Sequence, residues 1–360
     1  MIVNGEPRCR KCLQYNGKVA QITTRINPRF AKAKINYALS PEQNEISLKL
    51  LNGGTKIYVN AVCGAGKTEI TFQSIEKALA NGYRVGFIIP RRDVVKEIAT
   101  RLKKVYPQVI VSEVYGGHTQ ILDGEIVVLT THQVYRYPNK FGLIIVDEYD
   151  AFPFKGDEVL HHFVEQSCFG QKIYLSATWN KVELIGKENY ALNKRYHNHP
   201  LPVPVYLKCH HKLLLLKTLL ETRKLLKKPT CVFIFLPSIS ETIRYYSFLK
   251  CFFRDIMLYN SQCPNKEMIF KNIKQAKYRV VVCTTILERG ITIKNLDIIV
   301  AEADAPIFSH ETLIQIAGRV GRIASRNSGQ VLFLAQHKTH EITTCINTIE
   351  TTNLKVSFMP

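Results

Sequence analysis

The feature that most constrains this chain is a glycine-rich loop that joins an apolar run to an amphipathic one. The loop reads Ala61-Val62-Cys63-Gly64-Ala65-Gly66-Lys67-Thr68. The apolar run before it, residues 56–62, predicts a strand, and the run after it, residues 69–80, has apolar residues at helical spacing. A strand, a glycine-rich turn and a Lys-Thr pair that opens a helix form the layout of a phosphate-binding loop.

The small residues of such a loop let backbone N–H groups surround a phosphate, and the start of the helix adds partial positive charge. Lys67 would reach the β- and γ-phosphates of a nucleotide, and Thr68 would ligate Mg²⁺. Ala61 stands where the usual pattern has glycine, so a plain tight turn before a helix is the alternative interpretation. The Gly-Lys-Thr ending favours the phosphate site.

Chain length and net charge limit the class of protein that such a loop can belong to. The chain has 360 residues and a hydrophobic fraction of 46%, enough for two domains with full cores. Its net charge is +20, from 49 basic and 29 acidic residues. That charge favours a polyanionic partner, such as nucleic acid or an anionic membrane surface, although a dispersed charge gives the same sum.

The sequence shows neither a signal peptide nor an apolar run long enough to span a bilayer. Its ten cysteines stand mostly singly inside apolar segments, as Cys168, Cys231 and Cys283 do. That distribution is typical of reduced, buried thiols in a cytoplasmic protein.

Residues 1–38 are predicted to be a short basic N-terminal segment, with eight Lys or Arg against one acidic residue. Cys9 and Cys12 have the spacing of zinc ligands, but a closed structural site needs four ligands. Two alternatives stay open: half of a Zn²⁺ module among basic residues that contact DNA, or two thiols in a basic arm.

From Leu39 onward, apolar strand-like runs alternate with amphipathic helical ones, which predicts an α/β fold with parallel sheets. A proline-rich stretch, residues 199–205, interrupts the alternation and predicts a stiff linker. We therefore expect two α/β domains, residues 39–198 and 206–360. The predicted strands are 56–62, 84–89, 126–131, 142–147 and 172–177 in the first domain, and 231–236, 256–259, 279–285, 297–302 and 330–335 in the second.

Acidic residues end one of these strands. Asp147 closes the apolar run of residues 142–147, and Glu148 follows it. Ligands of open parallel sheets bind at the carboxyl ends of the strands. Asp147 would hold Mg²⁺, directly or through water, and Glu148 would polarise the water that attacks the γ-phosphate. A polar loop after a strand is the plain alternative.

The strongest pattern of the second half combines Gln315, Arg319 and Arg322, spaced so that a helix would present them on one face. Gly318 among them allows close approach, and an arginine that reaches the γ-phosphate neutralises charge that develops in the transition state. A solvated basic helix face is the alternative. The apolar residues between them favour a docked helix: Ile316, Ala317, Val320 and Ile323.

Together with Ser-Ala-Thr at 176–178, these motifs follow the order found in superfamily-two helicases, which have two tandem RecA-like domains. Finer details resemble ComFA, the family of DNA-uptake ATPases of naturally competent Gram-positive bacteria. The resemblance runs from about residue 8 to about residue 336, and the restart helicase PriA is the nearest relative to confuse with it. The stretches that carry it are Leu39-Ser-Pro-Glu-Gln43, 147–153, 284–292 and 315–322.

The resemblance implies roles for further residues. Gln43 matches the glutamine that reads the adenine edge, and Gly290 lies with Glu288 and Arg289 in the motif that couples the DNA contact to ATP. Motifs that touch the backbone of a single strand fall on residues just after apolar strands, where backbone N–H groups and hydroxyls can meet phosphates. The DNA-binding residues that follow are Pro90, Arg91, Thr131, His132, Ser238, Thr284 and Thr285.

The sequence departs from the family at its start. ComFA-like proteins usually carry a four-cysteine zinc module before the motor, and Cys9-Arg-Lys-Cys12 resembles only its second half. The chain is then either a natural short form or one whose start is cut. By resemblance the partners are single-stranded DNA and a phosphoribosyltransferase-like competence protein. The location implied is the cytoplasm, at the inner face of the cell membrane.

We therefore expect an ATP hydrolase that uses ATP and Mg²⁺ to move along single-stranded DNA and drive its uptake. Residues of both domains would bind the triphosphate. Two alternatives stay open: a PriA-like or RNA-directed helicase that unwinds duplexes, and an ATP-gated nucleic-acid-binding module with little turnover. Glu148 argues against the last, because a switch that only holds ATP gains nothing from a water-activating carboxylate.

Overall fold

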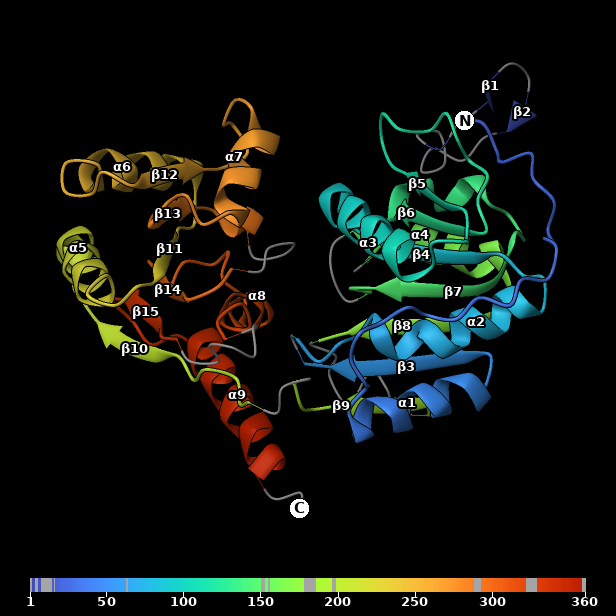
Figure 1. The fold of residues 1–360 in the computed structure, drawn as a ribbon. Helices are drawn as coiled ribbons and strands as arrows, with labels where there is room; N and C mark the ends of the chain where they lie inside the picture. The colour runs from blue at the N-terminus through green and yellow to red at the C-terminus, as the bar shows by residue number, and fades with distance from the viewer. Residues whose placement is uncertain are drawn as a thin grey trace. The chain divides into compact units, whose positions relative to one another are not determined.

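The structure is a computed structural model, and it describes most of the chain in two units. The described residues are 2–3, 6–7, 15, 17–62, 64–149, 153–154, 156–177, 186–195, 199–287, 293–321 and 329–357. The chain divides into two compact units, Met1–Leu192 and Asn193–Pro360, each built around one parallel sheet (Figure 1). The predicted α/β class with parallel sheets is confirmed.

Among the described residues, the first unit contains a seven-stranded parallel sheet in the order β5-β6-β4-β7-β8-β3-β9. A short antiparallel pair, β1 and β2, precedes it. The strands are β1 (Ile2–Val3), β2 (Glu6–Pro7), β3 (Lys56–Ala61), β4 (Val85–Ile89), β5 (Val111–Val114), β6 (Ile126–Thr130), β7 (Phe141–Asp147), β8 (Cys168–Ser176) and β9 (Asn189–Leu192). The helices are α1 (Pro41–Asn52), η2 (Glu69–Thr71), α2 (Phe72–Ala80), α3 (Arg92–Val105), η3 (Thr131–Arg136) and α4 (Glu158–Ser167).

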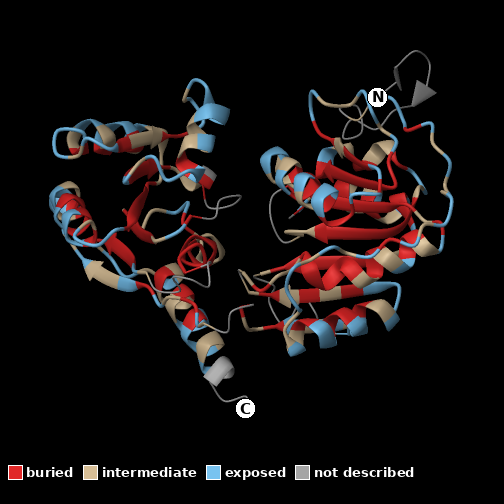
Figure 2. Ribbon diagram, viewed as in Figure 1, coloured by how far each residue is buried: buried red, intermediate tan, exposed pale blue. Residues whose placement is uncertain are grey.

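Both faces of this sheet are covered, which explains why its central strands are continuous apolar runs. Successive residues of a strand point to opposite faces, so Ile145 packs with α1, α2 and α3, whereas Ile144 and Val146 pack with α4 and η3. Buried residues accordingly fill the interior of the unit on both sides of the sheet (Figure 2).

The second unit repeats the plan with a six-stranded parallel sheet in the order β10-β15-β14-β11-β13-β12, again among the described residues. Helices α5 and α6 cover one face of it. The strands are β10 (Val205–Lys208), β11 (Cys231–Phe235), β12 (Ile256–Tyr259), β13 (Val280–Cys283), β14 (Leu296–Ala301) and β15 (Val331–Ala335). The helices are η5 (His211–Leu213), α5 (Leu214–Leu225), α6 (Ile239–Leu249), α7 (Lys266–Lys274), η6 (Thr285–Leu287), α8 (His310–Ala317) and α9 (His340–Ser357).

Every predicted strand is present, with ends that shift by a few residues. In the two large sheets the sequence missed β5, β9 and β10, and all three are edge strands; it also missed the short pair β1 and β2. An edge strand is short and half exposed, so its residues lack the apolar run that marks a central strand: β9 reads Asn-Tyr-Ala-Leu. The stretch predicted as a linker, residues 199–205, lies in the second unit, where Leu201 donates its N–H to Asn353 Oδ1 at 2.9 Å.

Residues 17–38, here called the strap, belong to the packing of the first unit. Backbone N–H groups of the strap donate to carbonyls elsewhere in the first unit. Ile26 donates to Gly82, in the loop before β4, at 2.9 Å, and Lys34 donates to Val105, at the end of α3, at 2.9 Å. Lys140, which precedes β7, donates to the Ile22 carbonyl at 2.8 Å. The strap therefore crosses the amino ends of the strands.

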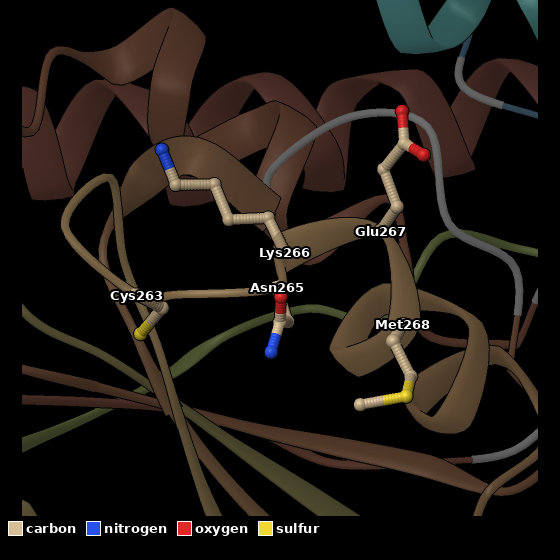
Figure 3. Close-up of a pocket in the computed structure, with 5 residues that line it drawn as sticks. All are labelled: Cys263, Asn265, Lys266, Glu267 and Met268. Carbon is tan, nitrogen blue, oxygen red and sulfur yellow. The ribbon is translucent and has the colours of Figure 1, made fainter.

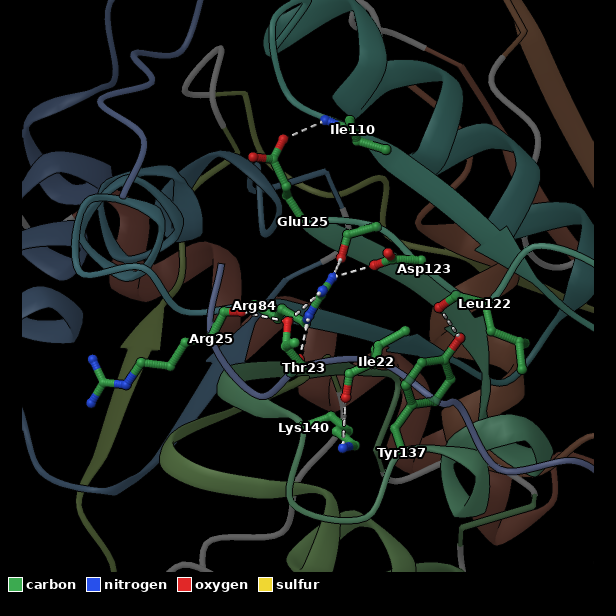
Figure 4. Close-up of polar contacts among 11 residues, drawn as sticks. Ile22, Thr23, Arg25, Arg84, Ile110, Leu122, Asp123, Glu125, Tyr137 and Lys140 are labelled. Carbon is green, nitrogen blue, oxygen red and sulfur yellow. Dashed lines mark hydrogen bonds and ion pairs between the residues drawn. The ribbon is translucent and has the colours of Figure 1, made fainter. Parts of the chain in front are cut away.

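Arg84 anchors the strap from the first unit (Figure 4). Its side chain is buried, and it donates to the carbonyls of Thr23 at 2.9 Å and Gly124 at 2.6 Å. Its charge is matched by Asp123 at 2.6 Å. A buried guanidinium needs such partners, because stripping it of water without them is costly.

Several cysteines meet the expectation of buried thiols. Cys168, Cys231 and Cys283 are buried and unpaired. Burial raises the pKa of the Cys168 thiol to about 11, so it stays protonated and unreactive at neutral pH. None of the helices in the described ranges is both long and apolar enough to cross a bilayer.

We predict that Arg84→Met loosens the strap, because the Thr23 and Gly124 carbonyls lose their donor and Asp123 loses its counter-ion. The expected loss is about 2–4 kcal/mol of stability. Hydrogen exchange of peptides from residues 17–38 should become faster. Lys32→Met is the matched control, because Lys32 is an exposed cation of the strap and its exchange effect should be slight. Equal protection in Arg84→Met and the wild type would contradict the anchoring role.

Candidate nucleotide and nucleic-acid sites

Three neighbouring strands of the first unit end at the residues predicted to bind nucleotide and at the Ser-Ala-Thr motif. The order β7-β8-β3 sets their carboxyl ends side by side. Asn60 of β3 lies opposite Ser176 of β8, and Leu175 of β8 lies opposite Asp147 of β7. The loop after β3, the fully buried Ser176 and Asp147 therefore share one edge of the sheet. Thr178 and Cys63 lie outside the described residues.

The described part of the phosphate-binding loop is shaped by its glycine at position 66. Gly66 has φ +80°, and a Cβ on it would clash with Nε2 of Gln43. The Ala65 N–H donates to the Val62 carbonyl at 3.1 Å, and Ala65 is fully buried. Lys67 stays half-buried, with its side chain partly accessible, and Thr68 is buried. The loop thus has the turn and the access that a phosphate group needs.

Gln43 supports this loop from outside. Its amide oxygen accepts from the Ser40 N–H at 2.9 Å, and Ser40 in turn caps the start of α1, which is a capping box. Its Nε2 donates to the Ala65 carbonyl at 2.7 Å. The structure therefore shows Gln43 buried as a brace of the loop, and its contact with adenine stays a prediction.

Glu69 is a brace that the sequence reasoning missed. It follows Thr68 directly and is buried, and its carboxylate pairs with Arg101 of α3 and accepts from the Tyr37 hydroxyl at 3.1 Å. A Cβ on Gly66 would lie 3.3 Å from its second oxygen. The first turn after the loop is the 3₁₀ helix η2 rather than the predicted α-helix, which begins at Phe72.

The turn after β7 has an unusual backbone at Glu148. Its φ is +56°, which costs a residue other than glycine about 1–2 kcal/mol. The Glu148 N–H donates to Asp147 Oδ1 at 2.9 Å. This geometry turns Glu148 out of the strand direction, beside Asp147, at the edge that carries the phosphate-binding loop. Asp150 lies outside the described residues.

Tyr149 anchors the same turn. Its N–H donates to the Leu175 carbonyl at 3.3 Å, and its ring centre lies 4.5 Å from that of Tyr174. Burial raises the pKa of Tyr149 well above its ordinary value, so the hydroxyl stays protonated, and it shares a hydrogen bond of 2.8 Å with Nδ1 of His161. The aromatic packing holds Asp147 and Glu148 in place.

The other half of the same sheet edge holds residues predicted to bind DNA. Strands β4, β6 and β5 are neighbours, and Pro90 and Arg91 follow β4 at the start of α3. After β6, His132 is exposed, whereas Thr131 is buried, and its hydroxyl has no partner among the described residues. His132 is thus available to a ligand, and the Thr131 side chain is not in this conformation.

The sequence reasoning missed a cluster after β5. The Arg92 guanidinium lies 4.8 Å from the centre of the Tyr115 ring, and Lys96 Nζ lies 5.6 Å from it. Gly116 and Gly117 follow, and a Cβ on either would meet nothing within 4 Å. The ring itself is buried and stacks on His118, so the cations beside the open glycine turn are the groups that suit a phosphate backbone. The Gly-Gly pair was the available sequence signal.

In the second unit, β11 and β13 are neighbours and end at predicted DNA-binding residues. Ser238 caps α6, where its Oγ accepts from the Glu241 N–H at 3.1 Å. Thr284 and Thr285 follow β13 and are half-buried. A capped helix start beside two hydroxyl residues is a surface that phosphates favour. Gly290, Glu288 and Arg289 lie outside the described residues.

A pocket of about 630 Å³ lies at the start of α7, which follows the edge strand β12 (Figure 3). None of its lining residues was predicted to act. Its wall mixes a thiol, an amide, a cation, a carboxylate and a thioether, from Cys263, Asn265, Lys266, Glu267 and Met268.

The predicted arginine helix ends earlier than its sequence pattern suggested. Helix α8 stops at Ala317, and Arg319 lies in the turn that follows, so the single helix face predicted for Gln315, Arg319 and Arg322 is wrong. Glycines at 318 and 321 end the helix, and Gly321 has φ +67°. Arg322 lies outside the described residues.

The docking of this segment is nevertheless as expected. Ile316, Ala317 and Val320 are fully buried, and Gln315 and Arg319 are buried as well. A solvated basic face is therefore excluded for the described part. The Gln315 amide oxygen has no hydrogen-bond partner among the described residues, as a group that awaits a ligand or a water would.

The residues of the first unit fit ATP with Mg²⁺. The backbone turn at Gly66, Lys67 and the carboxyl-end position of Asp147 supply amides, a cation and an oxygen ligand. Magnesium would be held by Thr68 and Asp147, where it offsets phosphate charge. Cys9 and Cys12, the residues considered for Zn²⁺, lie outside the described residues.

Known families cover both units. "Type III restriction enzyme, res subunit" matches residues 36–181, and "Helicase conserved C-terminal domain" matches residues 211–324. Competence protein ComFA of Streptococcus pneumoniae is 31% identical over 381 residues, which covers 96% of this chain and 85% of the relative. ComFA of Bacillus subtilis is 31% identical over 318 residues, with 82% and 67% covered.

Solved helicases share the fold. Dbp5 of S. cerevisiae, bound to RNA and ADP BeF3, gives a TM-score of 0.67 at 16% identity and covers 88% of both chains. Helicase Lhr of Mycobacterium smegmatis, bound to ssDNA and AMP-PNP, gives 0.67 at 17% identity, with 88% of this chain and 48% of that chain covered. The two units are therefore RecA-like domains, as predicted, and the chain is a superfamily-two ATPase.

We predict that Gly66→Ala weakens binding of a fluorescent ADP analogue at least about tenfold, because the new methyl group displaces Gln43 from the loop. Gly156→Ala is the matched control, since Gly156 has φ +85° but open space around it. It carries a similar backbone strain and should bind the analogue normally. Unchanged affinity in Gly66→Ala would contradict the assignment of the loop.

Proposed function

This chain belongs to the ComFA family, and from that premise we propose that it uses ATP to move along single-stranded DNA. We propose further that this movement drives the uptake of transforming DNA in natural competence. The observation that carries the proposal is the meeting of three strand ends at one sheet edge: the phosphate-binding loop, Ser176 and Asp147.

In the proposed cycle, Lys67 and Thr68 bind the phosphates and Mg²⁺, and Glu148 orients the attacking water. Arg319 and Arg322 of the second unit neutralise the charge that develops on the γ-phosphate, and the Gln315 amide hydrogen-bonds in the same site. Loss of that phosphate releases the arginines, and the change alters how each unit grips the strand.

The same sheet edge supports the DNA part of the proposal. Nucleotide residues follow β3, β8 and β7. In the other half of the same sheet, Arg92 and Lys96 lie on α3 after β4, and Tyr115 with the open glycine turn follows β5. A change at one half reaches the other through neighbouring strands. The exposed Arg92 of this cluster offers a cation to the phosphate backbone of the strand, and the buried Tyr115 ring positions it.

Family likeness supports three further proposals. The chain would work in the cytoplasm at the inner face of the cell membrane, and its partner would be a phosphoribosyltransferase-like competence protein. Cys9 and Cys12 would contribute to a Zn²⁺ site if two more ligands come from another segment or chain.

We predict that single-stranded DNA stimulates the ATPase activity and that Lys67→Ala and Glu148→Gln each lower it by at least about 100-fold, because one loses the phosphate cation and the other the water-orienting carboxylate. Turnover is measured with single-stranded DNA, duplex DNA, RNA and no nucleic acid. Glu148→Gln should still bind ADP normally.

The four ligand conditions, together with a strand-displacement assay on forked DNA, decide between the proposed functions. Stimulation by RNA alone, or strand displacement on forked DNA, would replace the proposal by an unwinding helicase. Slow turnover with every nucleic acid, at tight DNA binding, would replace it by an ATP-gated binding module. Full ATPase activity in both variants would contradict the assignment of Lys67 and Glu148 to ATP hydrolysis.

We also predict that Arg92→Ala lowers single-stranded DNA affinity and reduces the slope of log K against log salt by about one, because one phosphate contact is lost. Arg25→Ala is the control: Arg25 is also exposed, but it pairs with Tyr83 just before β4, at the amino ends of the strands. It should leave the slope unchanged. The same slope change in both variants would show that the charge acts diffusely.

A further inference from the structure

Arg195 binds the turn that carries Arg319. It is almost fully buried, with 2% of its surface exposed. Its Nη1 donates to the carbonyls of Val320 at 2.8 Å and Gly321 at 2.9 Å, and its Nη2 donates to the carbonyl of Gly318 at 3.1 Å. The three carbonyls lie on both sides of Arg319, so Arg195 fixes the peptides that flank it.

The bonds have a clear physical reason. The carbonyls that Arg195 binds lie in the turn just after α8, where buried carbonyls need a donor, and the partial negative charge at a helix end favours a cation there. Helix α8 ends at Ala317 in tight turns, where Arg319 donates its N–H to Ile316 at 3.1 Å. Arg195 supplies the cap for this end. Arginine suits this place because its planar fork presents Nη1 and Nη2 to different carbonyls, whereas a lysine ammonium donates from a single nitrogen on a flexible stem.

The other end of α8 is held separately. His310 Nδ1 lies 2.8 Å from Glu341 Oε2 of α9, and Ser309 caps the helix start. With Arg195 at the far end, the helix that carries Gln315 is fixed at both termini. A fixed arginine turn is what a transition-state contact requires, because small misplacements cost large factors in rate.

Arg195 also stands next to the division between the units. Leu192, the last residue of β9, accepts a hydrogen bond from the Val62 N–H at 3.0 Å, at the start of the phosphate-binding loop. Asn193 and Lys194 alone separate Leu192 from Arg195. Three residues of chain span at most about 10 Å, whatever the arrangement of the two units.

We propose that Arg195 is a positioning residue for ATP hydrolysis, which sets the turn of Arg319 and links that turn to the connection between the units. This inference rests on the proposed role of Arg319 in hydrolysis. Arg195 touches no nucleotide in this role, so it should act on turnover and not on ADP binding. A residue that served only stability would not make this distinction.

The test is a double-mutant cycle on the full chain, with ATPase activity measured at saturating single-stranded DNA. Arg195→Met and Arg319→Ala should each lower kcat at least about tenfold, and the dissociation constant of a fluorescent ADP analogue should stay within about twofold. The double variant should be no slower than Arg319→Ala alone, because the lost positioning acts through that residue. Arg195→Lys should lie between the wild type and Arg195→Met, and it decides the outcome if Arg195→Met does not fold.

Arg84→Met is the matched control, since Arg84 is also a buried arginine that donates to backbone carbonyls. Its effect on kcat should multiply with that of Arg319→Ala. Any of three results would overturn the inference. These are a kcat of the Arg195→Met, Arg319→Ala double variant that falls by the product of the two single losses, weakened ADP binding in Arg195→Lys, and full activity in Arg195→Met. Full activity in Arg319→Ala would instead contradict the proposed function.

Discussion

The register of β3 against β8, and of β8 against β7, is the constraint on which the nucleotide site depends. Because all three strands are parallel, their carboxyl ends meet at one edge, and each ends at a different chemical group: a cradle of amides, a hydroxyl and a carboxylate. The burial of Ile57, Val59 and Ile173 sets this register. A slip of one residue would turn these side chains to the opposite face of the sheet.

Several residues that contact no ligand hold the ligand-binding turns in their conformation. Gln43 and Glu69 close on Gly66 from two directions, one from α1 and one from the first turn after the loop. Arg195 does for the arginine turn of the second unit what these two do for the phosphate-binding loop. Gln43 and Arg195 are buried polar side chains that donate to backbone carbonyls of a glycine turn, whereas Glu69 lies beside Gly66 and pairs with Arg101. Such braces hold the ligand groups ready, so less ordering is needed when nucleotide binds.

The sequence predicted the central strands and the groups at their ends, because an apolar run and a following polar residue are local signals. It missed what depends on tertiary contact. Nothing local marks Arg195 as the cap of α8 or Arg101 as the partner of Glu69. Edge strands such as β9 lack an apolar run, and Arg319 departs from the predicted helix because α8 ends at Ala317, with Gly318 as its C-cap. The strap appeared in the sequence as a basic arm, because its backbone bonds to the first unit leave no pattern in its composition.

The measurement that tests the central claim most directly is a crystal structure of the chain with a non-hydrolysable ATP analogue, Mg²⁺ and a short single strand of DNA. We predict the triphosphate against Lys67 and Thr68, the metal beside Asp147, and Arg319 directed at the γ-phosphate while Arg195 keeps its carbonyl contacts. A triphosphate bound elsewhere, or an Arg319 turn directed away with no hinge able to bring it round, would contradict the account.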